Sequence, residues 1–114
     1  MESQHETAIA DMQREVCERY GLQETAVENM VAFATSTVGQ MPVYGTRLER
    51  RPDDNISWYF HCGEYSDADD FYQPVHTEHL QQMLPLVIKY LRLPPGTRFI
   101  VDDQGYEDVW QEPA

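Results

Sequence analysis

The stretch Ile56-Ser57-Trp58-Tyr59-Phe60-His61-Cys62 carries the strongest strand pattern in the chain. Aromatic residues favour strands, and Gly63 follows directly as a breaker. Successive side chains of a strand point to opposite faces of a sheet. We therefore expect Trp58 and Phe60 to share one largely buried face, with Tyr59 and His61 on the other face. Such a strand belongs in the centre of a sheet.

Further strand patterns lie on both sides of this stretch. Residues 42–48 alternate in the strand manner, and residues 97–101 and 106–110 look like a closing hairpin across a polar turn. Residues 30–35 are apolar but too short for periodicity to separate a helix extension from a strand, and we favour the strand. A mostly antiparallel sheet is therefore expected from roughly 30–35, 43–48, 56–62, 97–101 and 106–110.

The first segment, residues 4–20, is predicted to be an amphipathic helix. Ser3-x-x-Glu6 fits a capping box, and Gly21 is suited to end the helix. The apolar positions recur at helical spacing along one face: Ile9, Met12, Val16 and Tyr20. Residues 22–29 continue the helical pattern, so we expect residues 1–29 to form an N-terminal helical extension.

A second helical segment is expected over residues 77–91. Thr77 is suited to the N-cap, and Glu78 is favourably placed in the first turn. Pro85 interrupts the segment, because proline lacks an N–H and clashes with the preceding turn. We expect either a kink near residues 81–85 or two short helices, the second starting at Pro85. The predicted fold class is a single α+β domain over residues 1–114, with the helices packed on one face of the sheet.

The chain is strongly acidic, with 20 acidic against 8 basic residues and a formal net charge of -12. Such a field repels nucleic acid and anionic membranes and attracts a cationic partner, although excess carboxylates also serve solubility alone. The chain carries no apolar run of the roughly 20 residues that span a bilayer, and its start does not resemble a signal peptide. Cys17 and Cys62 show no CxxC spacing, which favours reduced thiols. We expect a cytoplasmic protein.

Four residues suggest an alternative metal-binding or enzymatic function. His76 and His79 can share a helical face, and His61 or Cys62 could complete a zinc shell. The pattern is not HExxH, however, and His61 and Cys62 are strand neighbours that point to opposite faces. No Walker loop, GxGxxG or GxSxG motif nominates a reaction. We therefore expect no enzyme, no bound metal and no cofactor.

Two dense acidic patches suggest a protein-binding surface. Their residues, with one aromatic anchor, are Glu64, Asp67, Asp69, Asp70, Tyr72, Asp102, Asp103, Glu107 and Asp108. The first patch lacks the glycine and the final glutamate of an EF-hand loop, and nothing in the pattern splits the pKa values of two carboxylates for catalysis. Nearby aromatic residues could anchor a partner or simply belong to the core. A solvated acidic loop is the alternative.

Several short motifs resemble small bacterial immunity proteins of polymorphic toxin systems, specifically their thirty-third class. The motifs are Ala34-Thr35-Ser36-Thr37-Val38, Pro42-Val43-Tyr44-Gly45-Thr46-Arg47, Pro52, Trp58-Tyr59-Phe60 and Gly63-Glu64. Residues 91–99 and 106–110 are similar to the C-terminal part of related members, so the resemblance covers roughly residues 30–110. The chain departs from that family at Asn55-Ile56-Ser57 and at Arg50-Arg51.

The resemblance implies inhibition by binding, without a transferable enzymatic mechanism. We expect an acidic intracellular immunity protein that neutralises a toxin with a basic surface. A toxin-unrelated interaction domain is a further alternative. The sequence identifies neither the toxin nor the oligomeric state.

Overall fold

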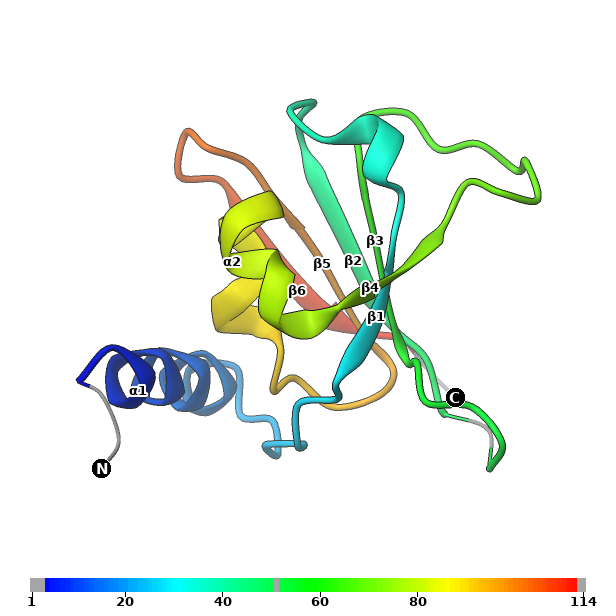
Figure 1. Cartoon of the computed structure of the whole chain (residues 1–114). Coiled ribbons are helices and arrows are strands. Elements are labelled where there is room, and N and C mark those ends of the chain that lie inside the picture. Colours follow the sequence, from blue (N-terminus) through cyan, green and yellow to red (C-terminus); the bar gives the residue numbers. More distant parts are fainter. Residues whose placement is uncertain (1–3, 51, 113–114) are drawn as a thin grey trace.

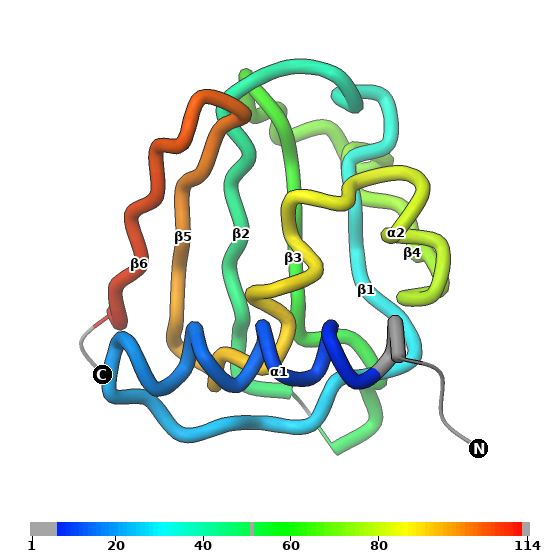
Figure 2. Tube along the Cα trace, turned by 90° about the vertical axis from the view of Figure 1, so that its left-hand side faces the viewer, coloured from blue at the N-terminus to red at the C-terminus, as the bar shows by residue number. Residues whose placement is uncertain are grey.

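The computed structural model describes residues 4–50 and 52–112, and these form one twisted sheet with helices on one of its faces (Figures 1 and 2). The elements are the α-helices α1 (Gln4–Arg19) and α2 (Leu80–Met83), the 3-10 helices η1 (Thr35–Thr37), η2 (Thr77–His79) and η3 (Pro85–Tyr90), and the strands β1 (Met30–Phe33), β2 (Val43–Arg47), β3 (Trp58–Cys62), β4 (Gln73–His76), β5 (Thr97–Val101) and β6 (Glu107–Gln111). The predicted α+β fold class is confirmed.

The six strands follow the order β4-β1-β3-β2-β5-β6. All neighbours pair antiparallel except β1 and β3, which are parallel. The expectation for the central stretch is confirmed, because Trp58 and Phe60 are fully buried on one face while Tyr59 and His61 are partly exposed on the other. Residues 30–33 form a strand, as favoured, and the C-terminal hairpin forms as predicted.

One strand and one loop differ from the expectations. Strand β4 was not predicted, because its residues are mostly polar and exposed and include Pro74. Its position at the edge of the sheet explains how a proline is tolerated there. The prediction that residues 22–29 continue the first helix is wrong. They form a loop that is tied down at both ends, by hydrogen bonds from the Thr25 amide to the Arg92 carbonyl and from the Thr77 amide to the Asn29 carbonyl.

The buried face of α1 is centred one residue later than its apolar pattern indicated. Met12 is 45% exposed, whereas Gln13 is buried beside Val16 and Cys17. The Gln13 amide donates to the carbonyl of Ile88 at 2.9 Å and accepts from Arg92 at 3.0 Å, which satisfies its polar atoms inside the core. The expected cap residue Ser3 lies outside the described residues.

Pro85 divides the second helical segment into two short helices, α2 and η3, which was one of the two expected outcomes. The second helix is of the 3-10 type and starts at Pro85. The prediction that Thr77 is the N-cap is wrong, because His76 occupies that position and Thr77 is the first residue of η2. The Thr77 hydroxyl instead donates to the carbonyl of Glu28. The segment therefore packs its apolar residues on the sheet while Thr77 anchors the 22–29 loop.

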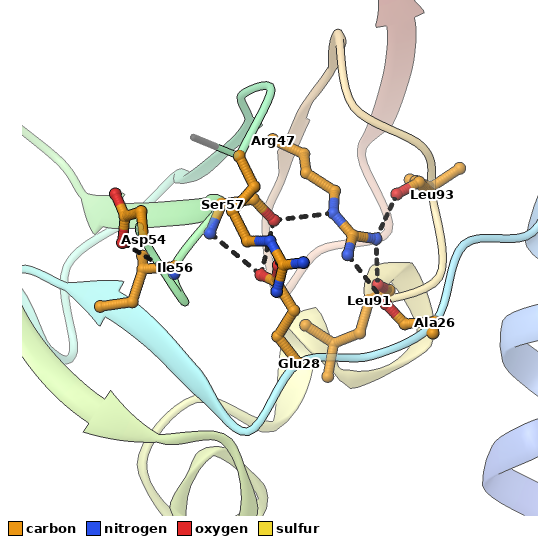
Figure 3. A network of polar contacts seen from close by, with 9 residues as sticks. Ala26, Glu28, Arg47, Asp54, Ile56, Ser57, Leu91 and Leu93 are labelled. Atoms are coloured by element: carbon orange, nitrogen blue, oxygen red, sulfur yellow. Dashed lines mark hydrogen bonds and ion pairs between the residues drawn. The ribbon is translucent and has the colours of Figure 1, made fainter. Parts of the chain in front are cut away.

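A buried arginine links the elements at one end of the sheet (Figure 3). Arg47 is 2% exposed, and its guanidinium lies 5.6 Å from the Trp58 ring. It donates to the Ser57 hydroxyl at 3.0 Å and to backbone carbonyls of three residues: Ala26 at 2.8 Å, Leu91 at 3.1 Å and Leu93 at 2.8 Å. Glu28 accepts from Ser57 at 2.6 Å and so places a negative charge nearby. One side chain thus joins two strands, the 22–29 loop and the segment before β5.

We expect Arg47→Lys to lower the free energy of unfolding by about 2–4 kcal/mol, because one ammonium group cannot reach carbonyls on separate segments and leaves several unpaired. Arg50→Lys is the matched control, since Arg50 is exposed and contacts Glu28 only across 3.7 Å. Urea denaturation of the three proteins measures the difference. A midpoint for Arg47→Lys equal to that of the control would contradict the anchoring role.

Gly45 in β2 makes room for the ring of Phe99. A Cβ atom at this position would lie 2.3 Å from two atoms of that ring, and the ring is buried between Trp58 and Tyr90. The glycine is therefore required by packing across the sheet.

Gly45→Ala is expected to destabilise the protein by about 1–3 kcal/mol, because the Phe99 ring must leave its place in a closely packed core. Thr46→Ala, on the opposite face of the same strand, controls for altered strand propensity. Thermal unfolding followed by near-ultraviolet circular dichroism reports both stability and aromatic packing. Equal melting temperatures for the two variants would refute the packing argument.

Candidate functional site

Three loops gather at one end of the sheet. The register places Val43, Cys62, Val101 and Glu107 side by side, so the segments 34–42, 63–72 and 102–106 all extend from the same end (Figures 1 and 2). We call these three loops the acidic end. They contain six carboxylates and no arginine or lysine. The two acidic patches of the sequence thus lie at the same end of the molecule, on either side of β2.

Most predicted site residues at this end are exposed. Glu64, Asp67, Asp69 and Asp70 lie in the 63–72 loop with exposed side chains, and Asp103 is exposed in the hairpin turn. Asp102 is partly buried, and its carboxylate accepts from the amides of Gln104 and Tyr106, both at 2.9 Å. The turn chemistry holds this loop in place, and the other carboxylates face solvent.

Glu107 and Asp108 are neighbours in β6 and point to opposite faces. Asp108 is exposed, whereas the Glu107 side chain is only 16% exposed. The Glu107 carboxylate accepts from Tyr20 at 2.6 Å, from Tyr90, and from Arg19 at 2.9 Å. Glu107 therefore ties β6 to helix α1 and to η3 within its own chain.

The hydrogen-bonding groups around Glu107 shift its pKa and that of a neighbour. Burial acts to raise the pKa of Glu107, but the hydrogen bonds from Tyr20 and Tyr90 and the charges of Arg19 and Lys89 outweigh it and hold the pKa below its ordinary value. Burial and the same carboxylate raise the pKa of Tyr20 to about 12. The cluster thus favours one charged carboxylate held by neutral phenols.

An aromatic cluster lies on the sheet face turned away from the helices, which we call the open face. His61 is at its centre and stacks on Tyr44 with ring centroids 4.6 Å apart. The rings of Tyr65, Phe71 and Tyr72 approach His61 at 5.7, 5.8 and 6.5 Å. Burial lowers the pKa of His61 from its ordinary value, so the neutral ring is favoured. Of the predicted aromatic anchor and its neighbours, Tyr72 is half-buried and Tyr65 is 63% exposed.

The four residues of the metal or enzyme alternative are not brought together. Cys62 is buried on the helix-covered face, where burial raises the pKa of its thiol, and His61 is on the open face. His76 and His79 are near each other, with ring centroids 5.7 Å apart, at the opposite end of β4 from the acidic end. Within the described ranges, no three histidine, cysteine or acidic side chains form a group that could hold a metal ion.

A family model describes most of the chain. The Imm33-like domain matches residues 12–112. The chain belongs to the Imm33-like domain family. The match begins inside α1, so it extends beyond the 30–110 segment on which the sequence resemblance rests. Membership suggests an immunity-protein family and a protein partner, and it suggests a protein without enzymatic activity.

The structure gives physical reasons for several residues of the Imm33-like motifs. Tyr44 stacks on His61, Gly45 admits Phe99, and Arg47 holds the buried network. Gly63 has a φ of 69°, and a Cβ atom there would lie 2.3 Å from the side chain of Gln40. These four motif positions therefore shape the sheet, whereas Ser36, Val38, Pro52 and Glu64 are exposed.

No curated protein and no solved structure matches the chain. Among the residues that the structure describes, no helix is both long and apolar enough to cross a membrane.

Sequence reasoning missed two features of the site. The open-face cluster joins Tyr44 and His61 to residues of the 63–72 loop. Period-two alternation could have placed Tyr44 and His61 on the same face only if the pairing of β2 with β3 were known. The anchoring role of Glu107 has no local signal, because its partners are 17 to 88 residues away in the sequence.

Glu107→Gln is expected to reduce the free energy of unfolding by about 1–3 kcal/mol at pH 7, since charge-assisted hydrogen bonds are lost. Because the folded-state pKa is lowered, the wild-type carboxylate contributes fully above its ordinary pKa near 4.5, and the contribution disappears as pH falls through the lower folded value. The difference between variant and wild type should therefore shrink on acidification. Chemical denaturation from pH 3 to 7 checks this, with exposed Asp108→Asn as the control; a pH-independent difference would contradict it.

Proposed function

We propose that this protein is an immunity protein that neutralises a cognate toxin by binding a basic surface of that toxin. The observation that carries the proposal is the acidic end in a chain of the Imm33-like family, where two of the three loops carry six carboxylates and none of the three carries an arginine or a lysine. Negative charges that lie close together at one end of a domain repel one another. Binding of a positively charged partner relieves this repulsion.

The distribution of the positively charged residues supports binding of a basic partner at the acidic end. Arginine and lysine occur only in three parts of the sequence, residues 14–19, 47–51 and 89–98. Several of them form ion pairs within the chain, such as Arg19 with Glu107 and Arg92 with Glu24. The field at the acidic end is therefore left without local compensation, and it steers a basic protein toward the loops before contact.

The aromatic cluster beside the acidic end supplies the short-range part of the proposed interface. Protein interfaces favour aromatic anchors surrounded by polar residues. Tyr65 and Tyr72 belong to the 63–72 loop, and their rings approach His61 of the open face. The same loop carries the exposed carboxylates of Asp69 and Asp70. In this mechanism charge sets the association rate, and ring burial sets the dissociation rate.

The proposed interface keeps eight of the nine residues suggested by the sequence. Glu107 is left out, because its carboxylate is engaged by Tyr20, Tyr90 and Arg19 of its own chain. We place the protein in the cytoplasm, where an immunity protein would meet a toxin before it acts on the cell.

The test is co-expression with the product of the gene adjacent to its own, followed by binding kinetics at two salt concentrations. Reversing Asp69 and Asp70 to lysine, or Asp102 and Asp103, should lower the association rate by about tenfold at low salt and by less at high salt. Protection of the cell from the neighbouring protein should weaken in parallel. Tyr72→Ala should instead mainly raise the dissociation rate.

Glu49→Lys combined with Asp53→Lys is the matched control. Both residues are exposed in the 48–57 loop at the opposite end of the sheet, and the change in net charge is the same. Binding that ignores salt and all four acidic substitutions would overturn the charge mechanism. If the neighbouring protein neither binds nor harms the cell, the immunity function itself is wrong.

A further inference from the structure

A small hollow lies where the acidic end meets the open face. It is lined by Gln40 and Met41 from the loop before β2, by Tyr44 and His61 from the strands, and by Glu64 and Tyr65 from the 63–72 loop. Tyr65 is 63% exposed and Met41 is 40% exposed, so both side chains are accessible from solvent. The hollow thus combines the exposed ring of Tyr65, the partly exposed rings of Tyr44 and His61, a flexible thioether and one carboxylate.

The chemistry of the hollow suits a planar cation. A guanidinium stacks on the faces of aromatic rings and donates hydrogen bonds from its edge to a carboxylate, and arginine is more often found in such contacts than lysine. Among the residues that the structure describes, no cationic side chain pairs with Glu64, and the nearest cations on either side in the sequence are Arg51 and Lys89. The carboxylate is therefore available to a partner.

The surroundings of His61 keep the floor of the hollow uncharged. Its ring is enclosed by Tyr44 from β2 and by Tyr65, Phe71 and Tyr72 from the 63–72 loop. Burial lowers the pKa of His61, so a neutral ring faces the hollow at neutral pH and does not repel a cation. The aromatic rings, the carboxylate of Glu64 and the neutral His61 therefore all favour a planar cation.

We propose that this hollow receives the guanidinium of one arginine side chain presented by the bound toxin. The inference rests on the proposed function, because it assigns the arginine to the protein that the acidic end attracts. The long-range electrostatic field of the acidic end attracts the partner. The hollow then fixes the orientation of the bound partner by holding one of its side chains. Glu64 and Tyr65 are the residues that recognise it.

The direct test uses a probe that does not depend on the toxin. The isotopically labelled full chain is titrated with the blocked peptide Ac-Gly-Arg-Gly-NH2, and amide shifts are followed by NMR. Shifts should concentrate at Gln40, Met41, Tyr44, His61, Gly63, Glu64 and Tyr65. The isosteric citrulline peptide should bind at least about tenfold more weakly, because it lacks the charge. The lysine peptide should also bind more weakly than the arginine peptide.

Two variants locate the site. Glu64→Gln and Tyr65→Leu should each weaken peptide binding by about threefold to tenfold, since each removes one half of the recognition. Asp103→Asn changes the net charge as much as Glu64→Gln but lies in the other acidic loop, so it should change binding by less than about twofold. Because Glu64 and Tyr65 are exposed, both variants are expected to fold normally.

Four outcomes would overturn the inference: no saturable shift at about 50 mM peptide, equal binding of the citrulline peptide, equal binding of the lysine peptide, or equal weakening by Asp103→Asn. With the toxin itself, Glu64→Gln and Tyr65→Leu should raise the dissociation rate. A toxin that binds all variants alike would reject the hollow and leave the immunity function standing. A neighbouring protein that never binds would reject that function, while the peptide titration still decides the hollow.

Discussion

The structure depends on the buried guanidinium of Arg47. A buried cation is costly unless every donor is satisfied, and this one is satisfied mainly by backbone carbonyls from parts of the chain that are far apart in sequence. Those carbonyls can converge only when the 22–29 loop, the end of η3 and strand β2 are all in place. The Trp58 ring covers the guanidinium, and its indole N–H donates to the Leu91 carbonyl that Arg47 also uses. The arginine therefore fixes how the helices sit on the sheet.

A second polar cluster holds the edge strand β6 in place. Glu107 joins β6 to α1 and η3, at a distance in sequence that no local propensity could supply. Between these two clusters, the central strands carry aromatic residues on both faces. One face packs against the helices, and the other is left open beside the acidic loops. The same sheet thus serves as the support of the core and as the floor of the proposed interface.

The fold could be predicted where the signal is local. Alternation in residues 56–62 identified the central strand and its buried face, and Pro85 marked the division of the second helical segment. Strand β4 could not be predicted, because a polar edge strand is defined by its partner β1 and not by its own composition. The candidate site was predictable only where its signal is local. Exposed carboxylates are visible in the sequence, but the inward turn of Glu107 and the meeting of Tyr44 with His61 depend on strand pairing.

The open aromatic face raises a question of self-association that the carboxylates answer. An uncovered sheet face with several rings is a surface on which two copies of a protein could stack. Each copy carries a net charge of -12, and the acidic end borders that face, so two copies that approach face to face meet like charge before their rings can touch. The repulsion reaches only about 10 Å at 0.1 M salt, which is enough to act at the moment of contact. The excess charge therefore opposes the stacking of two copies through this face.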